Sequence, residues 1–180
     1  MIFELKLPLH RKTRVWLDEL PDASFASENT LKKTLPASYT DIALGRKAAV
    51  EIMAPKGAII HYGLLGAEFT PNTSAVLRIR VAVGKAENKS YQSPLVLKFE
   101  KAIIGLEKDF ADEVLRSASD EISKRGQSPS GELLFACAVQ GAVGSNRVLF
   151  RQLGAMVGKL IMLNNRQPTQ EELVTLLSPQ

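Results

Sequence analysis

Gly131-Glu-Leu-Leu-Phe-Ala-Cys-Ala-Val139 is a short, apolar and partly alternating stretch that predicts a buried strand. Turn and capping residues follow it in Gln140-Gly-Ala-Val-Gly-Ser-Asn146. From Arg147 to Leu163, apolar residues recur at the spacing of a helix. The three segments predict a strand, a glycine-containing turn and a long amphipathic helix that starts with a basic surface. They indicate an architecture and one candidate binding site, and they show no catalytic group.

Two further helices are predicted on either side of this unit. Residues Leu106 to Lys124 carry one apolar stripe, and a segment with two glycines and a proline ends that helix near Gly131. Thr169-Gln-Glu-Glu172 matches a capping box and predicts a short C-terminal helix through Leu177. The acids of the first long helix are interpreted as a solvated outer face, and they are Asp109, Asp112, Glu113, Asp120 and Glu121.

The rest of the chain predicts strands and turns. Residues Val76 to Val83 form the clearest strand, because apolar side chains there alternate with Arg78 and Arg80. Thr30 to Leu35 predicts a short helical turn that Pro36 ends. The other predicted strands are Ile2–Leu7, Thr13–Leu17, Ala58–Leu65 and Leu95–Phe99, residues 42–52 are ambiguous between strand and helix, and turns are expected at 55–57, 70–74 and 84–93.

From Gly57 the predicted order of elements is β-β-β-α-β-α. Strands followed by helices that each bury one stripe predict an α+β fold, a two-layer sandwich with a mainly antiparallel sheet and two long helices on one face. The organisation expected from these patterns is an N-terminal strand-containing extension at 1–56, an α+β domain at 57–163, and a short C-terminal helix and tail at 164–180.

The composition is that of a globular protein. The 180 residues are 45% hydrophobic and 23% charged, and the net charge of +4 makes the surface mildly basic. The single cysteine, Cys137, excludes an intrachain disulfide and is expected in the core. No signal-like segment or membrane span is recognised, so we expect a cytoplasmic protein with no membrane partner.

Three segments between about Gly57 and Leu163 resemble domain IV of bacterial elongation factor G. Val76-Leu-Arg-Ile-Arg-Val81 is similar to an alternating basic strand of that family, and Leu97-Lys-Phe-Glu-Lys-Ala-Ile-Ile-Gly105 is similar to the strand before its first helix. Gln140-Gly-Ala-Val-Gly-Ser-Asn-Arg-Val-Leu-Phe150 resembles its turn, helix cap and phenylalanine-bearing helix. The resemblance implies the ribosomal protein S5 domain 2-like fold and contact with the ribosome.

The chain departs from that family in its expected ribosome-contacting loops. Residues Thr70 to Ser74 are neither glycine-rich nor basic, and the second loop lacks the family's histidine. No phosphate-binding GTPase motif occurs, so the resemblance does not imply translocation by this chain alone.

The start of the second long helix is a candidate phosphate-binding site. Backbone N–H groups at a helix N-terminus and the helix dipole favour an anion, and two arginines lie one turn apart beside it. The candidate residues are Gly144, Ser145, Asn146, Arg147 and Arg151. The alternative is an ordinary strand-to-helix turn with a serine or asparagine cap.

A second candidate site is the polar face of the strand at Val76–Val83. Arg78 and Arg80 share that face and could follow the phosphates of RNA, with Lys85, Lys89 and Lys98 nearby. The alternative interpretation is a solvated sheet face.

These patterns favour a non-catalytic binding module associated with RNA or the ribosome. We expect no catalytic residues, metal or cofactor, since neither His10 nor His61 has acids at ligand spacing. The alternative is a protein–protein adaptor or homo-oligomer that uses residues 1–56 as its interface. A small-molecule phosphotransferase using the loop at 141–146 is the third hypothesis.

Overall fold

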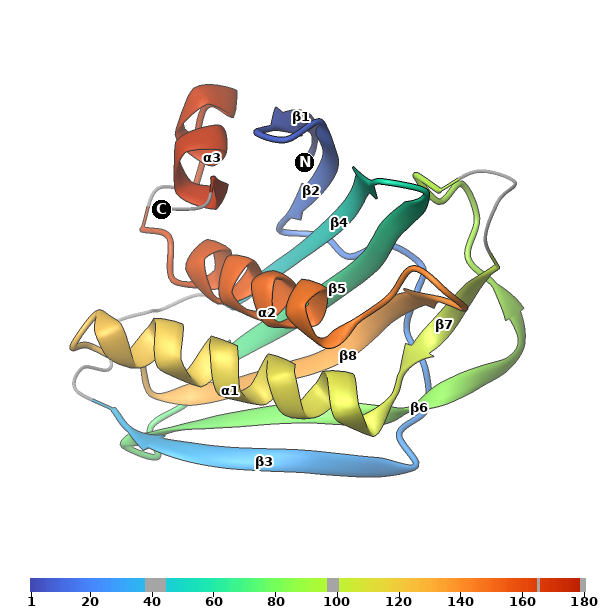
Figure 1. Ribbon diagram of the computed structural model, residues 1–180. Coiled ribbons are helices and arrows are strands. Elements are labelled where there is room, and N and C mark those ends of the chain that lie inside the picture. The colour runs from blue at the N-terminus through green and yellow to red at the C-terminus, as the bar shows by residue number, and fades with distance from the viewer. Residues whose placement is uncertain (38–44, 97–100, 165, 179–180) are drawn as a thin grey trace.

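An eight-stranded sheet curls around two long helices that lie side by side on one of its faces (Figure 1). The computed structural model describes residues 1–37, 45–96, 101–164 and 166–178. In these parts of the chain the sheet is antiparallel except where β6 pairs parallel with β8, and three helices complete the structure. The predicted α+β class and mainly antiparallel sheet are confirmed.

The strands follow the order β1-β2-β4-β5-β8-β7-β6-β3 across the sheet. Strands from the first 56 residues therefore belong to the same sheet as those that follow. The strands are β1 (Ile2–Leu7), β2 (Arg11–Leu17), β3 (Asn29–Pro36), β4 (Arg46–Lys56), β5 (Ile59–Pro71), β6 (Val76–Ser90), β7 (Ala102–Leu106) and β8 (Gly131–Gly141), and the helices are α1 (Lys108–Lys124), α2 (Arg147–Ile161) and α3 (Gln170–Leu177).

Strand β3 corrects one prediction from the sequence. Thr30–Leu35 was expected to form a helical turn, but the structure places it in an edge strand paired antiparallel with β6. Leu31 and Leu35 are partly buried against the helix-side core, because two-residue alternation brings both onto one face. Pro36 is tolerated at the end of an edge strand, where its missing N–H costs the ladder no hydrogen bond.

The region from Gly84 to Leu106 also differs from the prediction. Strand β6 continues through the expected turn to Ser90, where its second half pairs with β7. Leu95 and Val96 lie outside any strand, and the rest of the strand predicted at Leu95–Phe99 lies outside the described residues. Leu106 ends β7 instead of starting the helix, which begins at Lys108.

The main core lies between the sheet and the two long helices. Leu77, Ile79 and Val81 point from β6 toward the helices, as their alternation predicted. Leu153 and Phe135 are fully buried, in agreement with the buried strand predicted at 131–139 and the apolar stripe predicted at 147–163. Phe110 is only partly buried, and its ring stacks on that of Phe150 at 4.8 Å between centroids.

A β-bulge divides the apolar residues of β8 between two cores. Gly66 of β5 pairs with Cys137, whereas the next residue of β5, Ala67, pairs with Phe135, so Ala136 is the extra residue. Phe135 therefore faces the helices, and Cys137 faces the opposite side of the sheet.

The outer side of the sheet has its own smaller core. Trp16, Tyr62 and Cys137 are buried there, and irregular segments at 18–28 and 91–96 contribute Ala23 and Tyr91 to the same cluster. The predicted core position of the cysteine is confirmed, and burial raises the pKa of its thiol to about 12.

A buried carboxylate fastens the irregular segment at 91–96 to the outer side of the sheet. Glu51 of β4 is fully buried, and its Oε1 atom accepts hydrogen bonds of 2.8 Å from the Tyr62 hydroxyl and the Leu95 N–H. Arg14 Nη1 lies 3.2 Å from the other oxygen and also donates to the Ser93 carbonyl at 3.2 Å. These bonds hold segment 91–96 against the strands.

Two arginines bind carbonyl groups at the C-terminal end of α2. Buried Arg46 of β4 donates to the Leu163 carbonyl, and Arg125, just after α1, donates to the Met162 carbonyl at 3.1 Å. Cations here satisfy the free carbonyls and complement the helix dipole. Further along the chain, Thr169 and Glu172 form the predicted capping box of α3.

Candidate functional site

The turn between β8 and α2 uses its polar groups to join the strand to the helix. Ser145 Oγ accepts a 2.8 Å hydrogen bond from the Gly141 N–H and donates at 2.6 Å to the Tyr62 carbonyl. The Gly144 carbonyl accepts from the Tyr62 N–H at 3.3 Å. Asn146 is the N-cap of α2, and its Oδ1 accepts from the Leu149 N–H at 2.9 Å. The candidate loop residues therefore have structural roles in this conformation.

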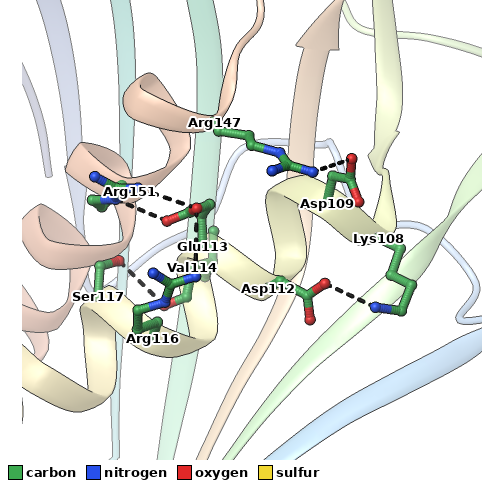
Figure 2. Close-up of polar contacts among 9 residues, drawn as sticks. All are labelled: Lys108, Asp109, Asp112, Glu113, Val114, Arg116, Ser117, Arg147 and Arg151. Carbon is green, nitrogen blue, oxygen red and sulfur yellow. Dashed lines mark hydrogen bonds and ion pairs between the residues drawn. The ribbon is translucent and has the colours of Figure 1, made fainter.

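The two arginines of α2 form ion pairs with α1 (Figure 2). Arg147 Nη2 lies 2.6 Å from Asp109 Oδ2, and Arg151 binds Glu113 through two bonds of 2.8 and 3.2 Å. These guanidinium groups lower the pKa values of both carboxyl groups. An anion approaching either arginine would compete with a carboxylate that is already bound.

The position of Glu113 contradicts the prediction of a solvated outer face. Its side chain is only 6% exposed, because α2 packs beside this part of α1. The sequence does contain a signal for the contact. Asp109 and Glu113 are four residues apart, as are Arg147 and Arg151. Two parallel helices can therefore form both ion pairs, each between residues 38 apart in the sequence.

Arg78 and Arg80 lie on the outer side of the sheet. Arg78 is exposed, whereas Arg80 Nη1 lies 2.8 Å from Glu132 Oε1 on β8. Lys32 of β3 is opposite Arg80 in the strand register and adds an exposed cation. The other predicted cations are more dispersed: Lys85 pairs with Glu107, Lys89 pairs with Asp22, and Lys98 lies outside the described residues.

The structure does not bring the two predicted basic sites together. The neighbours of Arg78 and Arg80 on β6 point toward the helices, so the arginines themselves point away from them. Arg147 and Arg151 lie in the helix layer on the opposite side of the sheet. The two pairs therefore form separate surfaces.

A cleft of about 770 Å³ lies beside Arg147 and was not predicted from the sequence. It is formed by the β1–β2 turn, the β4–β5 hairpin and the first two turns of α2. Its lining residues are Leu9, Arg11, Ala54, Pro55, Lys56, His61, Asn146, Arg147, Val148, Leu149 and Gln152.

The ionisable side chains of this lining, within the described parts of the chain, are Arg11, Lys56, His61 and Arg147. Arg147 already forms an ion pair with Asp109, and His61 Nδ1 lies 3.3 Å from the Asn146 side-chain nitrogen. Arg11 and Lys56 have no ion pair or hydrogen bond from their side chains to any described residue. The cleft thus combines apolar lining residues with two cationic side chains that can form ion pairs with an external anion.

No family model, curated protein or solved structure matches the chain. In the ranges that the structure describes, no group of three or more His, Cys, Asp or Glu residues could hold a metal ion. Nor is any helix there both long and apolar enough to cross a membrane.

Sequence reasoning missed the cleft because its walls come from three distant segments. Leu9, Lys56 and Val148 have no shared motif, and only the sheet order brings their turns to one end of the molecule. One signal was available in the sequence: the predicted turn at 55–57 carries a lysine, and the predicted helix start carries an arginine.

Proposed function

We propose that the protein is a non-catalytic binding module that holds an anionic macromolecular partner in the cleft beside α2. The observation that carries this proposal is the lining itself, where Arg11 and Lys56, together with His61 and Arg147, line the same cleft as several apolar side chains. A concave, largely apolar site with a few polar groups is the usual form of a binding pocket. Arg11 and Lys56 are the residues whose charge the partner would neutralise.

RNA or the ribosome is the second candidate partner, and its contact would be the outer side of β3 and β6. Lys32, Arg78 and Arg80 lie together there on an open sheet surface. The β-β-β-α-β-α order from β5 to α2 supports an S5 domain 2-like fold as part of this proposal. A relation to domain IV of elongation factor G and a cytoplasmic location belong to the same hypothesis.

The two surfaces can be separated by charge-reversal variants. Arg11→Glu/Lys56→Glu alters the cleft, and Lys32→Glu/Arg78→Glu alters the outer side of β3 and β6. Lys12→Glu/Lys124→Glu makes the same change in net charge at exposed positions outside both surfaces. Each tagged protein would be used for affinity capture from native lysate, with and without RNase.

Binding in the cleft predicts partners that the Arg11→Glu/Lys56→Glu variant loses and the matched control retains. RNA binding on the outer side predicts RNase-sensitive capture that Lys32→Glu/Arg78→Glu reduces. The affinity of this variant for RNA should also fall less steeply with salt, by about 0.7 to 0.9 in the log–log slope for each phosphate that it no longer binds. Identical capture by all four proteins would contradict both assignments.

A further inference from the structure

We infer that the occupant of the cleft is a peptide segment of a partner protein in which carboxylates lie among apolar side chains. This inference rests on the proposed function, since it names the partner chemistry of the same site. Three features of the cleft lead to it: its rim, the conformation of one turn, and its charge.

Aliphatic side chains extend beyond the cleft onto the surrounding surface. Leu9 and Val148 line the cleft and are 72% and 57% exposed. Ile59 and Val143 lie outside the lining and are 51% and 78% exposed. The hydrogen bond from the Tyr62 N–H to the Gly144 carbonyl joins β5, which carries Ile59, to the β8–α2 turn, which carries Val143. Exposed aliphatic side chains are thus present in the cleft and on the chain segments next to it, and a protein segment can cover more of them than a small ligand.

The β1–β2 turn presents its leucine to solvent in an unfavourable conformation. Leu9 and His10 have φ values of 65° and 58°, in the left-handed region that favours glycine and asparagine. Leu9 therefore combines backbone strain with an exposed apolar side chain, and neither stabilises the isolated chain. Contact with a partner provides a reason for both, because strained residues concentrate at binding sites.

The charge of the cleft specifies the rest of the partner. Arg11 and Lys56 can pair with carboxylates on an entering segment, and no acid of the lining competes with them in the described ranges. RNA fits this lining less well. His61 is the only aromatic side chain among the lining residues described, whereas single-stranded RNA sites stack bases on several aromatic side chains. Phosphates would also leave the aliphatic rim without an apolar partner.

The test uses the full chain and a phage-displayed library of random 12-residue peptides. Selected peptides should combine Asp or Glu with Leu, Ile or Phe. They would be synthesised with a fluorescent label, and binding would be measured by polarisation. We expect affinity to fall by about tenfold or more in Arg11→Glu/Lys56→Glu, as for the central residues of an interface. Lys12→Glu/Lys124→Glu, which makes the same change in net charge at exposed positions outside the cleft, should bind the peptides as the wild type does.

Leu9→Asn provides a variant in which folding and binding change in opposite directions. Asparagine tolerates the left-handed region, so the thermal midpoint should stay the same or rise. The variant removes the apolar side chain that the peptide would cover, so peptide affinity should fall by about fivefold or more. Unchanged peptide affinity in this variant and in Arg11→Glu/Lys56→Glu would overturn the inference, as would a library that yields no binding peptide.

A labelled 12-nucleotide RNA separates failure of this inference from failure of the proposed function. If the RNA binds, no peptide binds, and Arg11→Glu/Lys56→Glu abolishes RNA binding, the cleft holds an anionic partner but the peptide inference is wrong. If neither probe depends on Arg11 and Lys56, the peptide inference and the proposed function are both wrong.

Discussion

Gly154 of α2 lies directly against Val114 of α1: a Cβ atom built on the glycine would be 3.0 Å from the Val114 Cα atom. The same Cβ would also collide with Ser117 Oγ. The absence of a side chain at this one position lets the two helices approach closely, with α2 seated on the α1 backbone.

Gly154→Ala should therefore destabilise the protein by about 1–2 kcal/mol, because overpacking outweighs the helix-propensity gain of alanine. Gly158 is the matched control, one turn further along the same helix interface. A Cβ there would be 3.7 Å from the Ala118 Cα atom, an ordinary contact. Gly158→Ala should be neutral or stabilising by up to about 1 kcal/mol. Urea unfolding of the two variants checks the contrast, and equal effects would contradict this account of the helix contact.

The interhelical pair Arg151–Glu113 should stabilise the protein at neutral pH and lose its effect in acid. Arg151 lowers the pKa of Glu113 below its ordinary value of 4.5. A lowered folded-state pKa contributes stability above the unfolded-state value and loses it as pH falls through the folded-state value. The difference in thermal midpoint between wild type and Arg151→Gln should be greatest near pH 7 and should shrink below about pH 4.5.

Arg147→Gln is the control for that pair, because Arg147 and Asp109 are each 61% exposed and solvent screens their attraction. Its effect at pH 7 should be smaller than that of Arg151→Gln. A pH-independent difference between wild type and Arg151→Gln would show that packing, and not charge, explains the loss.

Glu51 should show the opposite pH dependence. Burial raises its pKa above the ordinary value of 4.5, although Leu95, Tyr62 and Arg14 oppose that shift. A raised folded-state pKa favours the fold below the unfolded-state value, and this contribution is lost as pH rises through the folded-state value. The stability of Glu51→Gln relative to wild type should therefore increase as pH rises above about 4.5.

The control for Glu51 is Glu4→Gln. Glu4 also lies near Arg14, at 3.6 Å, but its side chain is 77% exposed. Its stability relative to wild type should change little over the same range, and both variants can be followed by thermal unfolding monitored with circular dichroism. A parallel response of the two variants would assign the effect to Arg14 instead of to burial.

Truncation of the core should cost most where burial is complete. Leu153→Ala and Phe135→Ala should destabilise the protein by about 2–5 kcal/mol each. Phe110→Ala should cost less, because Phe110 is partly buried at the edge of the core. Chemical denaturation measures all three, and equal costs would indicate that the stacking of Phe110 on Phe150 compensates for its lower burial.

Helices were the most predictable part of this fold. The apolar stripes of α1 and α2 repeat over several turns, so each of these predictions had many residues to support it, and the capping box marked the start of α3. Strand β3 shows the opposite case. Its sequence, Asn-Thr-Leu-Lys-Lys-Thr-Leu-Pro, has only two apolar residues to bury, and its pairing with β6 depends on a partner about fifty residues away in the chain.

The candidate site was less predictable because its geometry depends on long-range packing. Arg147 and Arg151 were correctly placed at a helix start, but their acidic partners come from a helix 38 residues earlier. Glu113 looked like a surface acid, since charged residues are rarely buried unless they are paired. The cleft forms because the β1–β2 turn, the β4–β5 hairpin and the start of α2 come together at one end of the sheet, and no local sequence pattern predicts this arrangement.

Cys137 is a site at which chemical labelling can report on the segments that cover the outer side of the sheet. The segment at 18–28 is tied to β8 beside this thiol, with the Ala138 N–H donating to the Ala23 carbonyl at 3.1 Å. A thiol reagent can reach Cys137 only after that irregular cover lifts. The rate at which a reagent labels Cys137, compared with the rate of unfolding of the whole chain, would therefore show whether this cover opens while the helices stay packed on the other side.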